Sequence, residues 1–210
     1  FYFPKFFHPD PTVKRQSGFL KPQLNDSEIL GSSLTIPYYK VLSDDQDLTI
    51  KSNIFDSNVY MFQNEYRKEN EFSSFIADFS IVQGYRSSVP GSNKNTLSHF
   101  FAKFNADLNF DDFEYSDLDI SIEKTNNDTY LNIFEQNLSG TEIKITDSGT
   151  LNSSLKLSLD HDNYNLTTGF KFYEKLSGLN SDKFEYVFPY YDFSRNLDFN
   201  FPGSIGFSSS

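Results

Sequence analysis

Apolar side chains recur at every second position over long stretches of this chain. Between Phe100 and Phe110 the even positions hold Phe, Ala or Leu, whereas the odd positions, apart from Phe101, hold Lys, Asn or Asp. The same alternation returns at 155–159 and at 184–190. A period of two is that of a β-strand whose two faces meet different surroundings. No stretch of comparable length has the 3.6-residue spacing of a helix, so the sequence predicts an all-β fold.

Eleven strands are expected from this pattern. Most are close to the roughly 9 to 11 residues that a tilted strand needs to cross a bilayer, and longer than the roughly 5 to 6 residues typical of soluble sheets. Strand length is therefore the first indication of a membrane. The expected strands are 15–23, 33–42, 47–55, 58–68, 72–83, 98–110, 113–125, 150–160, 163–174, 183–193 and 197–207.

The connections between these strands alternate between short and long. Short turns are expected at 43–47, 68–71, 111–112, 161–163 and 194–196, and longer polar loops at 24–32, 84–97, 125–150 and 174–183. The short link at 56–58 is an exception, because it falls where a long loop is expected. Short turns at one rim and long loops at the other are typical of an outer-membrane β-barrel. The alternation alone fits a soluble antiparallel sheet with one wet face equally well, but the loop lengths favour the barrel.

Composition excludes several other classes of protein. The 24 Phe and 13 Tyr are too many for a disordered chain, and a net charge of −11 argues against a nucleic-acid partner. With no Cys, there is neither a disulfide framework nor a thiolate metal site. No apolar run reaches the roughly 20 residues of a membrane helix. A first residue Phe1 and a single methionine, Met61, suggest an internal segment of a longer protein.

The sequence contains no convincing catalytic or metal-binding motif. Asp44, Asp45 and Asp47 lack the Gly and the distal Glu of a calcium loop, so a solvated turn is the better interpretation. The run 160–162, Asp-His-Asp, is interpreted as a turn in the same way. Neither a Gly-x-Ser-x-Gly elbow nor a phosphate-binding loop is present. The sequence therefore predicts a non-catalytic protein without a cofactor.

Two prolines stand out, because Pro22 and Pro37 fall on the first two expected strands. A proline in a strand cannot donate a ladder hydrogen bond and is tolerated at edges or in weak pairings. On the residues alone, they either end strands and protect an edge or weaken a pairing that has to open.

Several short motifs occur in order along nearly the whole chain. They are Phe1-Tyr2-Phe3-Pro4, Arg15-Gln16-Ser17-Gly18-Phe19-Leu20 with Pro22, Ile36-Pro37-Tyr38-Tyr39, Asp47-Leu48-Thr49-Ile50, Glu65-Tyr66-Arg67, Asp128-Thr129-Tyr130-Leu131 and Tyr186-Val187-Phe188-Pro189. In this order they resemble the LptD family of LPS-assembly proteins, at the junction where the periplasmic jellyroll of that family passes into its first barrel strands.

The resemblance implies that residues 1–14 end the jellyroll and that 15–210 form the N-terminal part of an antiparallel, up-and-down transmembrane β-barrel in the outer membrane of a Gram-negative bacterium. It implies lipopolysaccharide as the transported substrate, an LptE-type lipoprotein inside the barrel and an LptA-type periplasmic bridge bound through the jellyroll. It also implies that Pro22 and Pro37 belong to a lateral gate between the first and last strands. Two other classes remain open, namely a different outer-membrane channel or porin and a soluble β-sandwich adhesin.

Overall fold

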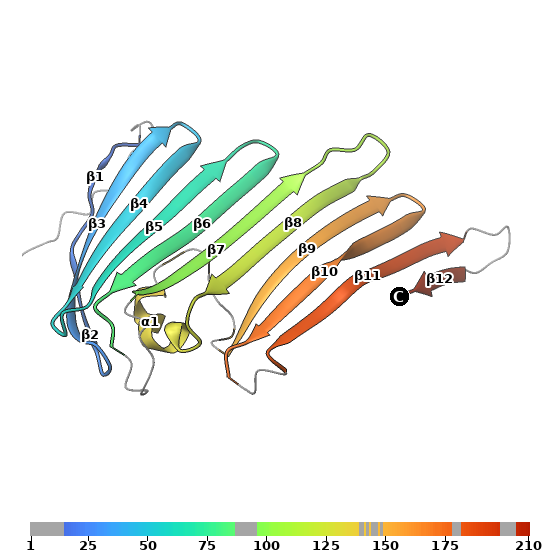
Figure 1. The fold of residues 1–210 in the computed structure, drawn as a ribbon. Coiled ribbons are helices and arrows are strands. Elements are labelled where there is room, and N and C mark those ends of the chain that lie inside the picture. The colour runs from blue at the N-terminus through green and yellow to red at the C-terminus, as the bar shows by residue number, and fades with distance from the viewer. Residues whose placement is uncertain are drawn as a thin grey trace, which may run out of the picture.

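The protein forms one antiparallel sheet of 12 strands and a short helix, as seen in a computed structural model (Figure 1). The structure describes residues 15–86, 96–138, 141, 143, 147, 149–177, 182–197 and 205–210. The expectation of an all-β antiparallel fold is confirmed. The predicted jellyroll end at 1–14 lies outside the described residues. No helix in the described part of the chain has the length and apolar character needed to cross a membrane.

The strands are long from β3 to β11, as the alternation predicts. The elements are β1 (Gly18–Phe19), β2 (Gln23–Ser27), β3 (Gly31–Ser43), β4 (Gln46–Phe55), β5 (Tyr60–Glu69), β6 (Ser73–Gln83), β7 (Thr96–Asp107), β8 (Tyr115–Thr125), α1 (Tyr130–Leu138), β9 (Thr150–His161), β10 (Tyr164–Lys175), β11 (Phe184–Leu197) and β12 (Ile205–Ser209).

From β2 to β12 each strand pairs with its neighbours in sequence, and β1 pairs with β3, so the sheet is an up-and-down meander. The order is β1-β3-β4-β5-β6-β7-β8-β9-β10-β11-β12, with β2 also paired to β3. In the described residues the sheet is open, because β1 and β2 form one edge and β12 forms the other. This topology is consistent with a segment of a larger barrel.

Three sequence expectations about connections are wrong. The loop expected at 24–32 contains β2, which pairs with β3 and leaves only 28–30 as a turn. The turn expected at 194–196 belongs to β11, which continues to Leu197, so the strand expected at 197–207 is β12 (Ile205–Ser209). The turn expected at 111–112 is the longer link 108–114. In the first two cases polar residues belong to a strand, because pairing with the neighbouring strand outweighs local composition.

The connections divide the sheet into two ends. The links 44–45, 70–72, 108–114 and 162–163 lie at one end, which we call the turn end. At the other end, the loop end, β2 connects to β3, β4 to β5, β6 to β7, β8 to β9 and β10 to β11, and Figure 1 shows α1 there. The predicted sorting of short and long connections therefore holds from β6 onward, whereas the first two links of the loop end are short.

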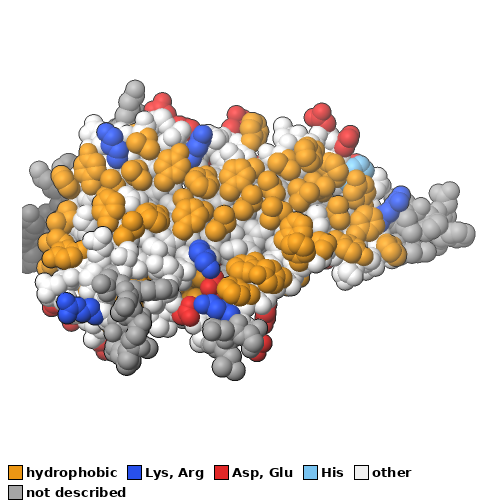
Figure 2. All heavy atoms as spheres, viewed as in Figure 1, with side chains coloured by type: hydrophobic (Ala, Val, Ile, Leu, Met, Phe, Trp, Pro, Cys, Tyr) orange, Lys and Arg blue, Asp and Glu red, His pale blue; other side chains and the backbone are white. Residues whose placement is uncertain are grey.

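One face of the sheet is apolar across most of its width. We call it the outer face, and Figure 2 shows it as a nearly continuous apolar band. By the strand registers, the polar residues Ser52, Asn64 and Thr168 also lie on this face. Its apolar residues, assigned from the strand registers, include Leu34, Ile36, Tyr38, Leu48, Ile50, Ile54, Tyr60, Phe62, Tyr66, Phe75, Phe79, Ile81, Phe100, Phe104, Leu118, Ile120, Ile122, Leu155, Leu157, Leu159, Leu166, Phe170, Phe172, Phe184, Tyr186, Phe188, Tyr191 and Phe193.

The outer face has no protein layer over it in the described chain. Phe188 is 72% exposed and Phe62 is 47% exposed. Exposed apolar surface of this extent marks a binding surface or a membrane-facing one, because soluble monomers rarely tolerate it. The apolar residues Phe104, Leu157 and Phe188 share this open face and do not meet in a closed core.

The opposite, inner face is polar in its middle and at the turn end. Between β3 and β8 it contains Ser33, Thr35, Asp47, Thr49, Asn53, Gln63, Glu65, Asp78, Ser80, His99, Glu123 and Thr125, all buried. At the loop end the inner face becomes apolar, with Phe55, Met61, Val82 and Leu97 in one buried cluster with α1. The core of the described chain therefore sits at one end of one face.

A close approach of strands occurs at Gly169 on β10. A Cβ at this position would lie 2.1 Å from the backbone oxygen of Leu155 and 3.0 Å from Tyr190 Oη. The register with β11 shifts between Gly169 and Lys171, so that β11 contains one extra residue beside Pro189. Pro189 therefore lies at a β-bulge, where the missing donor is tolerated, in agreement with a purely structural role.

We predict that Gly169→Ala destabilises the sheet. The new methyl group would force apart β9 and β10, and overpacking of this kind costs about 1–3 kcal/mol of the free energy of unfolding. Gly18→Ala is the matched control, because nothing lies within 4 Å of its Cβ position. Urea unfolding of the intact protein in detergent measures both variants, and equal stabilities would contradict the prediction.

Candidate functional site

The first edge of the sheet is interrupted where the two candidate prolines lie. Phe19 pairs with Tyr38 and Gln23 pairs with Thr35, so three residues, 20–22, face only two on β3. Pro22 lies in this interruption, and Pro37 lies opposite it. The structure therefore brings together at one break two residues that the sequence assigns to separate strands. Pro22 itself is not part of a strand.

Pro37 removes a hydrogen bond from this edge and not from the sheet interior. The Leu20 amide donates to the Pro37 carbonyl over 2.9 Å, so the backbone of Pro37 faces the first strand. The N–H and C=O of one strand residue point to the same side. The donor that proline lacks is therefore missing from the ladder between β3 and the edge.

The edge is short as well as interrupted. β1 contains 2 residues and β2 contains 5, whereas β3 contains 13. Side chains hold its turn end instead: Arg15 Nε donates to Tyr39 Oη over 2.8 Å, and Ser17 Oγ accepts from the Val41 amide over 2.9 Å. Arg15 also forms an ion pair with Asp47.

The acidic turn that resembles a calcium loop has other partners. Asp47 is buried and accepts from Arg67 Nε over 2.8 Å. The Ser43 hydroxyl donates to Asp45 over 2.5 Å and holds the pKa of that carboxyl below its usual value. In the run 160–162, His161 Nδ1 accepts from the Asn163 amide over 3.1 Å. In the described residues, no group of three or more His, Cys, Asp and Glu could hold a metal ion.

A buried polar cluster lies on the inner face, beneath α1. We define it as Gln63, Asp78, Ser80, His99 and Tyr130. Gln63 Nε2 donates to Asp78 over 2.8 Å, and His99 Nε2 lies 3.2 Å from the same carboxylate. His99 Nδ1 lies 2.9 Å from Ser80 Oγ and 2.8 Å from Tyr130 Oη. Four of its members come from neighbouring strands, and Tyr130 comes from the helix.

The helix is formed by local signals and held by packing. Asn127 Oδ1 accepts from the Thr129 amide over 2.9 Å and caps its N-terminus. The helix buries Tyr130, Leu131, Ile133, Phe134 and Leu138. The ring of Phe134 contacts that of Phe55 in an edge-to-face arrangement, 6.2 Å between centroids.

Burial of the Tyr130 side chain raises the pKa of its phenol, because the phenolate would be desolvated. The phenol therefore keeps its proton and can donate a hydrogen bond to the cluster. The composition of the cluster, with Ser80, His99 and Asp78, is that of a catalytic triad, but all three side chains are buried at 1% exposure or less. A closed cluster of this kind anchors the helix to the sheet and gives no access to a substrate.

The sequence pattern does not single out His99, and it predicts a long polar loop and no helix at 125–150. The cluster depends on the registers of β5 with β6 and β6 with β7, which align Gln63 with Ser80 and Ser80 with His99. The spacing of Tyr130, Phe134 and Leu138 by four residues was the available signal for the helix.

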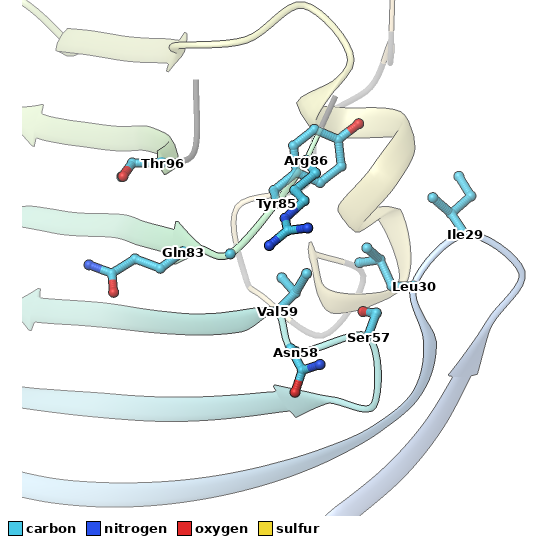
Figure 3. A pocket seen from close by; sticks show the side chains of 10 residues that line it. Ile29, Leu30, Ser57, Asn58, Val59, Gln83, Tyr85, Arg86 and Thr96 are labelled. Atoms are coloured by element: carbon cyan, nitrogen blue, oxygen red, sulfur yellow. The ribbon is translucent and has the colours of Figure 1, made fainter. Parts of the chain in front are cut away.

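A pocket of about 820 Å³ opens at the loop end beside α1 (Figure 3). Arg86 is the only charged side chain among the described residues that line it. Its other lining residues are Ile29, Leu30, Ser57, Asn58, Val59, Gln83, Gly84, Tyr85 and Thr96. Without a carboxylate or an imidazole in this lining, these residues contain no acid–base pair.

Comparison with known proteins gives one local similarity. A segment of 54 residues is 39% identical to the LPS-assembly protein LptD of Methylococcus capsulatus. The matched segment is 26% of this chain and 5% of that protein, so the chain corresponds to a small part of it. No protein-family model matches the chain. The similarity supports a relationship to LptD over this segment.

We predict that Phe134→Ala releases α1 from the inner face. Loss of a buried phenylalanine costs about 3–5 kcal/mol, which is more than a helix of 9 residues can supply on its own. Hydrogen exchange of the α1 amides should become faster, while that of β9 and β10 stays unchanged. Phe110→Ala is the control, because Phe110 is 46% exposed in a link of the turn end. Unchanged exchange in α1 would show that other contacts hold the helix.

Proposed function

We propose that this chain is part of the wall of an outer-membrane β-barrel that moves lipopolysaccharide and releases it sideways at the edge formed by β1 and β2. The observation that carries the proposal is the break at this edge, where Pro22 and Pro37 lie opposite each other in a short ladder. The local similarity to an LPS-assembly protein supports the choice of substrate.

The two faces of the sheet support a position between lipid and water. The outer face is an uncovered band of Phe, Leu, Ile and Tyr, whereas the middle of the inner face is polar. On β5 the band has Tyr60 near the loop end and Tyr66 near the turn end, where tyrosines of a barrel meet the two interfaces. A soluble sheet would cover its apolar face with a second layer.

The edge supports lateral release on energetic grounds. Each backbone group that loses its partner in lipid costs several kcal/mol, so an opening seam needs few bonds to break. The interrupted ladder beside this seam, without the Pro37 donor, leaves few bonds to hold β1 and β2 against β3. We infer that a strand from the rest of the protein completes the seam, that an LptE-type lipoprotein faces the polar inner surface, and that an LptA-type bridge delivers the substrate.

Simple measurements on the intact protein separate this proposal from its competitors. A barrel requires detergent for extraction and shows heat-modifiable mobility on gels, whereas a soluble adhesin does neither. Copurification with a lipoprotein distinguishes the translocon from a porin. A protein that is soluble without detergent would refute the membrane assignment.

We predict that Pro22→Ala and Pro37→Ala in the intact protein slow the appearance of new lipopolysaccharide at the cell surface. Each substitution restores a backbone donor at the break, so the seam closes more tightly. The double variant should be slower than either single variant. The measurement is pulse-labelling of lipopolysaccharide followed by its accessibility at the surface.

Pro189→Ala is the matched control for this experiment. It also removes a proline from a strand, but at the bulge of β11 and away from the first edge. Export at the normal rate in the Pro22 and Pro37 variants, with correctly assembled barrels, would remove the gate assignment from both residues.

A further inference from the structure

Charged residues on the inner face of β7–β11 are sorted along the strands. Nearest the turn end, the registers align Asp107 with Asp117 and, through Ser158 and Thr167, with Asp192. Four residues further from the turn end, Lys103 aligns with Ser121, Ser154 and Lys171. This part of the inner face therefore has carboxylates at the turn end and lysines in its middle.

A third lysine lies between these two levels. Lys156 of β9 aligns with Asp119 and Gly169, one inner-face position from the level of Lys103 and Lys171. With strands about 4.8 Å apart and about 3.3 Å per residue, the three Cα atoms fall within a patch about 15 Å across. We call Lys103, Lys156 and Lys171 the lysine patch.

The lysine patch is open to solvent from the inner side. Lys103 and Lys156 are exposed and Lys171 is half-buried, in contrast to the buried side chains beneath α1. Lys171 Nζ lies 4.9 Å from the centre of the Tyr190 ring, which orders the side chain without neutralising it. Lys156 Nζ lies 3.8 Å from Asp119, which is a loose contact for an ion pair.

The nearby carboxylates have partners in addition to the lysines. Asp119 accepts a hydrogen bond from Asn105, and Glu123 accepts from the Asn152 amide over 2.8 Å. Ser121 and Ser154 stand between the lysines and add hydroxyl donors. Ammonium groups interspersed with hydroxyls are suited to phosphate oxygens, which accept hydrogen bonds from both.

We infer that the lysine patch binds phosphate groups of an amphiphile that lies along the inner face. The inference rests on the proposed function, because it places the phosphorylated head group of the transported lipid at this level. A phosphate is repelled by the carboxylates at the turn end and attracted by the three ammonium groups, so it occupies the middle of the face. The chain as a whole has a net charge of −11, so the lysine patch is a local positive region on a negatively charged protein.

The test measures binding of two lipid probes to the intact protein in detergent, a bisphosphorylated lipid A and the same lipid after enzymatic removal of its phosphates. In the triple variant Lys103→Gln, Lys156→Gln, Lys171→Gln, affinity for the phosphorylated lipid should fall about tenfold or more. The affinity for the dephosphorylated lipid should not change. Raising the salt concentration should reduce the difference between wild type and variant.

Three further variants make the result specific. Replacing the same lysines by arginine should preserve affinity, because the charge remains. Asp119→Asn should strengthen binding, since Lys156 loses its acidic neighbour. Lys124→Gln should have no effect, because Lys124 lies on the outer side at the loop end, paired with Glu174.

The outcomes distinguish this inference from the proposed function. If wild-type protein binds neither lipid, the transport proposal fails and the inference fails with it. If wild type binds both lipids and the glutamine variant binds them equally well, only the phosphate site is refuted. Loss of a copurifying lipoprotein, with lipid affinity unchanged, would overturn the inference by assigning the lysine patch to a protein partner.

Discussion

The strict register of the hydrogen-bonded ladders is the constraint on which the rest of the structure depends. Because side chains alternate between faces, a slip of one residue in any ladder would move the Phe and Leu of that strand to the inner face. The registers from β3 to β11 instead keep the apolar residues of one face aligned across the sheet. An apolar face of this width without a covering layer is stable only against lipid or another apolar surface.

The prolines illustrate how the same residue type has different consequences in different ladders. Pro189 lies at a bulge between two long strands, where the pairing on both sides of the bulge continues. Pro22 and Pro37 lie in an edge ladder that is already short, and the next ladder, between β3 and β4, is intact at Pro37. The fewer hydrogen bonds a ladder has, the larger is the fraction of them that one missing donor removes. This interrupted edge therefore opens more easily than the long, continuous ladders between β3 and β10.

The period-two pattern was enough to predict the all-β fold and the approximate bounds of β3 to β11. It failed for β2, since Asn25, Asp26 and Ser27 lack apolar alternation and their strand exists only because β3 provides a partner. It failed for α1, because the stability of a helix this short comes from residues such as Phe55 and Met61, distant in sequence. Sequence also marked Pro22 and Pro37 as candidates, but only the register shows that they face the same break.

The inner face has three zones along its strands, and each sets a different condition for the proposed transport. At the loop end, α1 and its apolar neighbours are buried, so a molecule that leaves there has to displace the helix and expose several side chains worth about 1.5–3 kcal/mol each. From β7 to β11, lysines and serines are accessible in the middle, whereas carboxylates line the face at the turn end. Contact with these zones gives acyl chains no favourable free energy of burial. On reaching the lipid at the outer side of the first edge, they gain the full free energy of transfer from water to an apolar environment. In the proposed transport, the apolar part of an amphiphile therefore meets a lower barrier sideways, at the interrupted first edge, than through the long ladders of the sheet.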